Sequence, residues 1–194
     1  EVRHWHLLGS PLHLKRLYMN IMSNAVKYNK DKGKIFVECR ETSSREDIAE
    51  IEFICQDTGI GMKPEFQKHV FDPFVQESNT ARTSYGGTGL GLAIVKNLIE
   101  KMGGTITFES EPGVGSTFYL TVPFKIDQNA AARDDTGIKI IPKLVHIVFL
   151  DVAGNGGKNV QVIVFEPSDV LIMIFELCHV VCQIFLLTGL KLQL

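Results

Sequence analysis

The sequence predicts an α/β sandwich, in which a mixed β-sheet is covered on one side by about three α-helices. Two long segments, residues 11–28 and 90–102, carry apolar residues at the three- and four-residue spacing of amphipathic helices. Four apolar runs of strand length, bounded by glycine, proline or polar residues, come as two consecutive pairs. We therefore expect one layered domain over residues 1–126, a linker over 127–137 and an apolar C-terminal segment over 138–194.

The first helix has a clear start and a clear end. Ser10 and Pro11 combine a capping hydroxyl with a proline at the first helical position. The polar, glycine-containing run 29–33 ends the pattern. Between them, apolar residues recur on one face: Leu14, Leu17, Tyr18, Ile21, Met22, Ala25 and Val26.

The remaining elements follow in order along the chain. Strands are expected over residues 34–41, 49–56, 105–110 and 116–124. Between them we expect a polar loop over 42–47, a glycine-punctuated loop over 57–62, a short helix over 64–70, a long mobile loop over 76–87 and a turn over 111–115. The second long helix, over 90–102, is stopped by a pair of glycines.

Composition narrows the class of protein. A hydrophobic fraction of 45% allows a buried core, and a formal charge of −2 argues against nucleic acid and acidic membrane surfaces as partners. Four cysteines in 194 residues make no disulfide framework, so we expect a reducing, cytoplasmic compartment. The chain opens without a signal-peptide pattern or an initiator Met, which predicts a piece of a longer protein whose membrane anchoring stays open.

The C-terminal segment has several interpretations. Residues 170–190 are long enough to span a bilayer, but Glu176, His179 and Gln183 would be costly there. A β/α-type packing appendage and a non-native continuation, such as a shifted reading frame, are the alternatives. Cys178, His179 and Cys182 could suggest a metal site, but no second ligand cluster accompanies them, and we expect buried spacers.

Three polar residues of the first helix carry chemistry. Asn20 and Asn24 are four residues apart and so share one helix face, and Lys27 lies almost one turn further along. Amide oxygens are hard, neutral ligands suited to Mg²⁺, and a lysine supplies a point charge for phosphate. A polar face that merely meets water is the alternative for this helix alone.

Two glycine-rich loops add to this pattern. Asp57 follows an apolar strand and precedes Gly59 and Gly61, so its carboxylate could accept from an exocyclic amine such as that of adenine. An ordinary Asp-X-Gly turn is the alternative. The run 86–92 opens a helix with unencumbered backbone amides, which suit phosphate, but it is neither a Walker A loop nor a dinucleotide fingerprint.

The order of these motifs resembles the catalytic ATP-binding domain of sensor histidine kinases, in the gyrase, Hsp90, histidine kinase and MutL group. The resemblance covers about residues 3–125. The runs "NIMSNAVKY", "DTGIGM", "FDPFVQ" and "GGTGLGLAIVKNLIEKMGG" resemble its asparagine, first glycine, phenylalanine and second glycine boxes, and "GVGSTFYLTVPF" its closing hairpin. The resemblance implies a Bergerat-type ATP-binding fold with a mobile lid.

The resemblance also implies a set of site residues. Asn24 and Lys27 are the expected catalytic residues, with Asn24 ligating Mg²⁺ and Asn20 as a second candidate ligand. Phe71 and Phe74 are expected to anchor the lid, although two aromatics three apart also suit a core. The implied ATP contacts are Asn20, Asn24, Lys27, Tyr28, Asp57, Gly59, Gly61, Phe74, Arg82, Gly87, Thr88, Gly89, Leu90, Gly91 and Thr117.

The function implied is donation of the ATP γ-phosphate to a histidine on a dimerisation domain of the same parent protein, with a response regulator downstream. None of the chain's own histidines has the sequence context of that phosphoacceptor, so we expect ATP binding without appreciable self-phosphorylation. A non-catalytic ATP-binding regulatory module and an ATPase clamp of the gyrase or MutL kind are the alternatives. We expect no membrane contact for this part of the chain.

Overall fold

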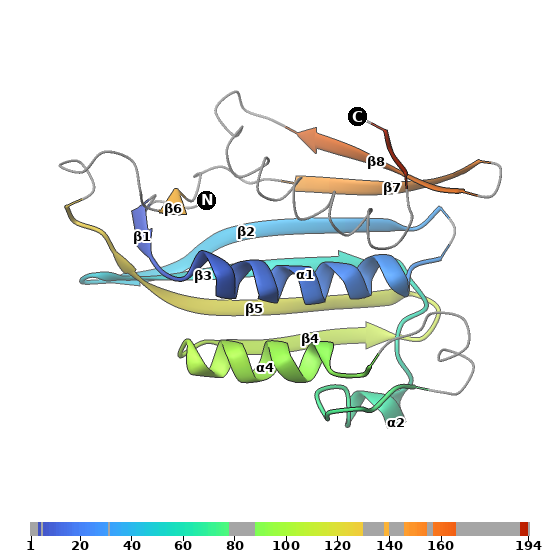
Figure 1. The fold of residues 1–194 in the computed structure, drawn as a ribbon, viewed down its shortest axis with the longest axis horizontal. Coiled ribbons are helices and arrows are strands. Elements are labelled where there is room, and N and C mark those ends of the chain that lie inside the picture. Colours follow the sequence, from blue (N-terminus) through green and yellow to red (C-terminus); the bar gives the residue numbers. More distant parts are fainter. Residues whose placement is uncertain are drawn as a thin grey trace.

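The fold is a two-layered α/β sandwich, as predicted. The structure is a computed structural model, and it describes residues 4, 6–30, 32–77, 88–129, 138–139, 146–154, 157–165 and 191–193. Helices α1 (Pro11–Lys27) and α4 (Gly91–Lys101) lie across one face of the sheet, and the short helix α2 (Pro64–Gln67) lies at the edge of this helical layer (Figure 1). Ser10 caps α1 as expected, because its side chain accepts a hydrogen bond from the His13 backbone N–H.

The central sheet is built from β1 (His6–Leu8), β2 (Lys34–Arg45), β3 (Ile48–Asp57), β4 (Thr105–Glu111) and β5 (Gly115–Ile126). All pairs among these strands are antiparallel, and β5 pairs with β1, β3 and β4. The register sets Asp57 opposite Ser116, so the end of β3 lies beside the start of β5. This juxtaposition places one wall of the site described below.

The loop predicted over residues 42–47 is wrong in extent. Strand β2 continues to Arg45, and only Glu46 and Asp47 form the turn before β3. Glu46 has a φ of +52°, and the ladder shifts register between Glu41 and Ser43. The polar composition suggested a loop, but threonine and serine are compatible with a strand when a neighbouring strand offers backbone partners.

The helix predicted over 64–70 is also too long. It starts at Pro64 as expected but ends at Gln67, after which the backbone turns through three-residue hydrogen bonds. The His69 N–H donates to the Phe66 carbonyl, and the Asp72 N–H donates to the His69 carbonyl, both at 2.9 Å. The chain therefore makes tight turns after α2 in place of another helical turn.

The core lies between the helices and the sheet. Alternate residues of β3 are buried, and the same face of α1 that carries the apolar spacing is buried against them. The rings of Tyr18 and Phe53 join the two layers, with centroids 4.4 Å apart. The largest fully buried side chains are those of Leu7, Leu17, Ile21, Met22, Cys55, Val95, Ile99 and Leu120.

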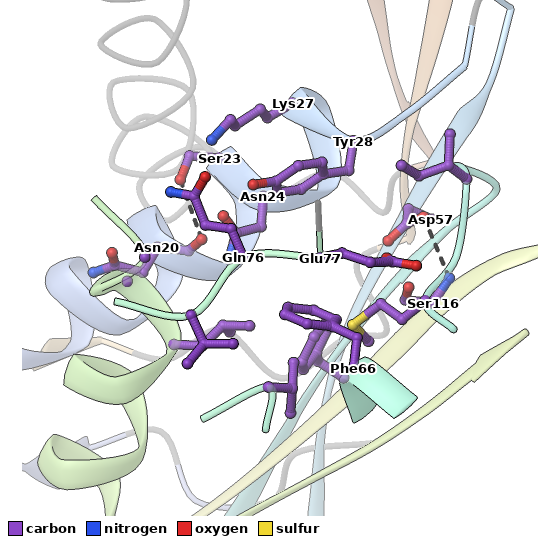
Figure 2. A pocket seen from close by; sticks show the side chains of 18 of the residues that line it. Asn20, Ser23, Asn24, Lys27, Tyr28, Asp57, Phe66, Gln76, Glu77 and Ser116 are labelled. Atoms are coloured by element: carbon purple, nitrogen blue, oxygen red, sulfur yellow. Dashed lines mark hydrogen bonds between the residues drawn. The ribbon is translucent and has the colours of Figure 1, made fainter. Parts of the chain in front are cut away.

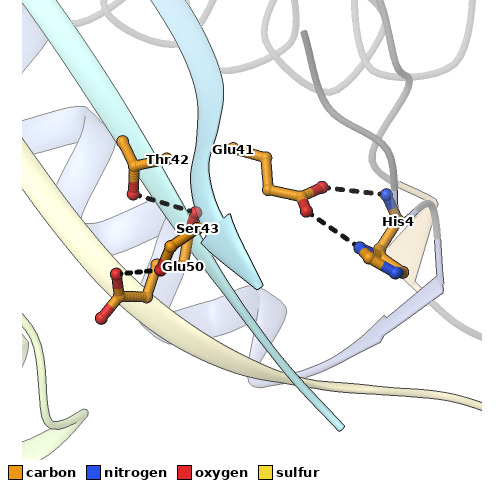
Figure 3. A network of polar contacts seen from close by, with 5 residues as sticks. All are labelled: His4, Glu41, Thr42, Ser43 and Glu50. Atoms are coloured by element: carbon orange, nitrogen blue, oxygen red, sulfur yellow. Dashed lines mark hydrogen bonds and ion pairs between the residues drawn. The ribbon is translucent and has the colours of Figure 1, made fainter. Parts of the chain in front are cut away.

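A polar clasp ties the N-terminal segment to β2 (Figure 3). The buried carboxylate of Glu41 accepts from the His4 backbone N–H at 3.0 Å and lies 2.9 Å from the His4 ring nitrogen Nδ1. Thr42, at the register shift, donates to the Glu50 carbonyl across the hairpin at 3.4 Å. These contacts lie away from the pocket and fix the entry of the chain into β1.

The described parts of the C-terminal segment are strands. They are β6 (Ile138–Lys139), β7 (His146–Gly154), β8 (Gly157–Phe165) and β9 (Lys191–Gln193). Strand β7 pairs antiparallel with β2, and β8 pairs parallel with β9, so the complete sheet is mixed. Within the described residues no helix combines the length and apolar character needed to cross a bilayer. Residues 170–190 lie outside the described part, as does most of the linker predicted over 127–137.

Candidate functional site

The site is a cavity of about 270 Å³ between the C-terminal half of α1, the loop after β3 and the start of α4. Figure 2 shows the α1 side chains on one side, Asp57 and Ser116 on the other, and Gln76 and Glu77 on the segment between them. The lining residues are Asn20, Ser23, Asn24, Lys27, Tyr28, Asp57, Ile60, Gly61, Met62, Phe66, Val70, Val75, Gln76, Glu77, Thr88, Gly89, Gly91, Leu92, Ser116 and Phe118.

Asp57 is the buried acid of the pocket, with a residue exposure of 8%. Its Oδ1 accepts hydrogen bonds from the backbone N–H groups of Gly59 at 2.8 Å and Ser116 at 3.3 Å. Burial raises the pKa of the Asp57 carboxyl to about 6, although these two hydrogen bonds oppose the shift. The carboxylate is therefore mostly ionised near pH 7 and is held in one orientation.

The glycines after Asp57 serve backbone packing. A Cβ at Gly59 would lie 2.3 Å from the Tyr28 carbonyl oxygen, and one at Gly61 would lie 1.9 Å from the Glu111 carbonyl oxygen. Gly61 also has a φ of +64°, which favours glycine. Gly59 and Gly61 were predicted from the resemblance as ATP contacts. The structure adds that they let this loop press against α1 and against the β4–β5 turn.

Ser116 lines the pocket but was not predicted from the sequence. The expected contact was Thr117, but side chains alternate along β5, and Ser116 and Phe118 line the cavity while Thr117 does not. The Ser116 hydroxyl lies 3.0 Å from the Ser110 hydroxyl of β4, which fixes its position. The buried Phe118, two residues further on, was a usable signal for which face of β5 is turned inward.

Asn20, Asn24 and Lys27 all line the pocket, as their spacing on α1 predicts. The Asn20 Nδ2 donates to the Arg16 carbonyl at 2.8 Å, and its Oδ1 has no hydrogen-bond donor among the described residues. The Lys27 ammonium lies 4.7 Å from the centroid of the Tyr28 ring, a cation–π distance. Two amide oxygens and one cation thus share this side of the cavity.

The glycine-rich run before α4 is only partly described. Thr88, Gly89 and Gly91 line the pocket, whereas Leu90 precedes α4 without lining it. A Cβ at Gly91 would lie 3.0 Å from the Asn20 Oδ1, so a side chain there would crowd that oxygen. Gly87 and Arg82, two predicted ATP contacts, lie outside the described residues, as does the lid predicted over 76–87 beyond Glu77.

The two phenylalanines before that run differ. The Phe71 ring packs edge-on against Phe108, with centroids 5.7 Å apart. Phe74 is 67% exposed, has a φ of +66° and does not line the pocket, although it was predicted to contact ATP. Its backbone N–H donates to the Gly89 carbonyl at 3.0 Å, so Phe74 joins the two sides of the lid region through its backbone.

The described residues contain no group of three or more His, Cys, Asp or Glu side chains arranged to hold a metal ion. Cys39 is partly buried and Cys55 is fully buried, and both are free thiols. Burial raises the pKa of the Cys39 thiol to about 12, so it stays protonated and unreactive. The oxygen ligands that line the pocket include the amides of Asn20 and Asn24 and the carboxylates of Asp57 and Glu77.

The chain is similar to several known sensor kinases. A histidine protein kinase of Candida albicans, "Histidine protein kinase 1", is 42% identical over 116 residues, which are 60% of this chain and 5% of that protein. The sensor histidine kinase GacS of Pseudomonas protegens is 40% identical over 116 residues, or 60% of this chain and 12% of that protein. A solved mycobacterial sensor histidine kinase, MprB, has a TM-score of 0.48 at 27% identity, covering 63% of this chain and 80% of that chain.

The described fold is a two-layered sandwich in which a buried acid and an asparagine-bearing helix line one pocket. Residues 9–126 match the family described as histidine kinase-, DNA gyrase B- and HSP90-like ATPases, and the chain belongs to this family. Membership of this family implies that the domain binds ATP. The chain spans only 5% and 12% of the length of the two kinases compared above.

Proposed function

We propose that residues 9–126 form the ATP–Mg²⁺-binding catalytic domain of a two-component sensor histidine kinase. The observation that carries the proposal is that Asp57 and the Asn20–Asn24–Lys27 face of α1 line one pocket. A carboxylate acceptor suits the adenine amine, and amides with a lysine suit a metal-bound triphosphate. The acceptor is a histidine on a separate dimerisation domain, with a response regulator downstream and a cytoplasmic location.

The donor set of the pocket fits Mg²⁺. Asn24, with Asn20 as a second ligand, would hold the ion together with phosphate oxygens and water, because the orientation of the Asn20 amide leaves its oxygen available. When bound, Mg²⁺ neutralises charge on the phosphates during transfer. Lys27 adds a positive charge on the same helix face. We assign Thr88, Gly89 and Gly91 to the phosphates, through backbone amides near the N-terminus of α4.

Asp57 and Ser116 orient the base. The ionised Asp57 carboxylate accepts from the adenine amine, and the hydrogen bonds that hold it are made before the ligand arrives. With the base held at this end and the phosphates held at α1, the terminal phosphate is presented at the mouth of the pocket to an incoming histidine. Positioning of this kind supplies most of the catalysis in phosphoryl transfer.

The test is a transfer assay with a supplied acceptor. The chain is mixed with γ-labelled ATP, Mg²⁺ and a dimerisation domain from a relative such as GacS, and acid-labile label on histidine is measured. We expect label on the supplied domain and none on the chain alone. Asp57→Ala and Asn24→Asp should abolish the label, the first by removing the base acceptor and the second by adding charge beside the phosphates. His13→Ala, on the exposed side of α1, is the matched control.

Each other outcome identifies a different function. ATP binding without label on any supplied dimerisation domain would indicate a non-catalytic regulatory module. Hydrolysis coupled to dimerisation of the chain would indicate an ATPase clamp. Absence of binding heat for Mg·ATP in a well-folded sample would reject the proposed function altogether.

A further inference from the structure

Two carboxylate oxygens in the pocket have no hydrogen-bond partner among the described residues. Asp57 uses only its Oδ1, which accepts both backbone N–H groups, and its Oδ2 is left without one. Glu77 uses only its Oε1, which accepts the Lys63 backbone N–H at 3.1 Å. Both residues line the cavity, and Asp57 is more than nine-tenths buried. Acceptors left unpaired in such a site call for donors on a ligand.

Glu77 lies at the same end of the pocket as Asp57. Figure 2 shows its side chain extending toward Ser116 and Asp57, with Lys27 and Ser23 on the far side. Its backbone segment follows Val75 and Gln76, which also line the cavity. The hydrogen bond to Lys63 links this segment to the residue that precedes α2, which holds the carboxylate in place.

We propose that Glu77 is a second nucleoside-recognition residue, which accepts a hydrogen bond from the nucleoside through Oε2. This inference rests on the proposed function and deepens it. The phosphates of ATP are acceptors at neutral pH and would repel a carboxylate, whereas the nucleoside carries donors. These donors are the two N–H groups of the adenine amine and the two ribose hydroxyls. Asp57 takes one amine hydrogen, and Glu77 takes either the other one or a ribose hydroxyl.

A carboxylate in this position makes the site selective. A nucleotide that lacks the matching donor leaves the carboxylate oxygen desolvated and unpaired, which is penalised more strongly than a lost neutral contact. Glu77 is only partly buried, so water can partly replace the missing donor. We expect a loss of about tenfold rather than the several-thousand-fold of fully buried polar sites.

Glu77→Gln tests this inference with little change in shape. The glutamine oxygen can still accept from Lys63, while an amide NH₂ replaces the free carboxylate oxygen. Isothermal titration of the full chain would compare Mg·ATP with N6-methyl-ATP, 2′-deoxy-ATP and 3′-deoxy-ATP on both proteins. We expect Mg·ATP to bind about tenfold more weakly to the variant. On the natural chain, one analogue should bind about tenfold more weakly than ATP, whereas on the variant the same analogue and ATP should bind with equal affinity. The identity of that analogue shows whether the amine or a ribose hydroxyl is the donor.

The controls separate failure of this inference from failure of the proposed function. Glu65→Gln removes an exposed carboxylate of α2 that does not line the pocket, and it should bind every nucleotide as the natural chain does. If the natural chain binds no Mg·ATP, the proposed function fails. If the natural chain binds Mg·ATP and Glu77→Gln binds it equally or more tightly, or if all analogue losses are the same in both proteins, only the role of Glu77 is rejected.

Discussion

The two ends of the pocket are built differently. At the end that holds Asp57, the backbone makes the site: Asp57 accepts two N–H groups, and the Gly113 N–H donates to the Ile60 carbonyl at 2.7 Å. At the α1 end, side chains make it: Asn24 and Lys27 project from a helix whose own hydrogen bonds do not depend on them. The hydrogen bonds that build the Asp57 end also hold the fold together, whereas the side chains at the α1 end are not needed for the fold.

This difference predicts how each end responds to mutation. Changes at the Asp57 end should alter the stability of the fold and nucleotide affinity together, because the same hydrogen bonds serve both. Changes at the α1 end should alter affinity while leaving the fold intact.

Gly61→Ala should destabilise the fold most. The new Cβ would lie 1.9 Å from the Glu111 carbonyl oxygen, and the φ of +64° is unfavourable for alanine, so the loop after β3 must move away from the β4–β5 turn. We expect the free energy of unfolding to fall by about 2–4 kcal/mol, together with weaker ATP binding. Urea denaturation measures the first effect and isothermal titration the second.

Gly113→Ala is the matched control. Gly113 lies in the β4–β5 turn that Gly61 contacts and has a φ of +79°, but a Cβ there would have no atom within 4 Å. The free energy of unfolding should therefore fall by only about 1 kcal/mol, because alanine is strained at this φ but meets no other atom. Equal losses in the two variants would show that backbone conformation, not the close approach of loop and turn, sets the requirement for glycine at residue 61.

Asp57→Asn should also change both stability and nucleotide affinity, but in opposite directions. The asparagine keeps an oxygen for the Gly59 and Ser116 N–H groups but removes a buried charge and the proposed acceptor for the adenine amine. We expect nucleotide affinity to fall by about 10- to 100-fold while the nucleotide-free protein becomes more stable. Thermal unfolding without nucleotide and titration with Mg·ATP measure the two effects.

The gain in stability should depend on pH. The pKa of Asp57 rises from 3.8 to about 6 on folding, so the folded state loses stability as pH rises through this range and the carboxyl ionises. The variant should therefore match the natural chain near pH 4 and exceed it by up to about 3 kcal/mol above pH 7. A gain that is the same at both pH values would show that removal of the charge is not its cause. In the natural chain, Mg·ATP affinity should fall as pH is lowered through about 6.

The fold and much of the site could be predicted from sequence because their signals are local. The cap at Ser10, the spacing on α1 and the alternation in β3 each reflect one element, and the structure agrees with them. Asn20, Asn24 and Lys27 share a helix, so periodicity alone brings them to one face. Asp57 meets them in one pocket through the fold, and its place there was predicted from the order of the motifs.

The features that were missed depend on contacts between elements distant in sequence. Strand β2 extends past Glu41 because β3 pairs with it, and a polar run gives no sign of that partner. Thr117 was expected in place of Ser116 because the facing of a strand depends on the sheet it joins. Two further contacts form only when separate loops meet: the close approach of the Glu111 carbonyl to Gly61 and the hydrogen bond between Lys63 and Glu77.

Lys27→Met gives the smallest effect and the sharpest test of the comparison. Methionine keeps most of the length and apolar stem of lysine but removes the charge that lies 4.7 Å from the Tyr28 ring centroid and faces the pocket. The fold should be nearly unaffected, because the lost cation–π contact is worth only about 0.5–1 kcal/mol at an accessible site. Mg·ATP affinity should fall by about three- to tenfold in low salt, and this difference should shrink in high salt, since screening weakens the attraction of the ammonium for phosphate. If instead the variant lost stability as Gly61→Ala does, the α1 end would be part of the fold like the Asp57 end, and the proposed division of the pocket would be wrong.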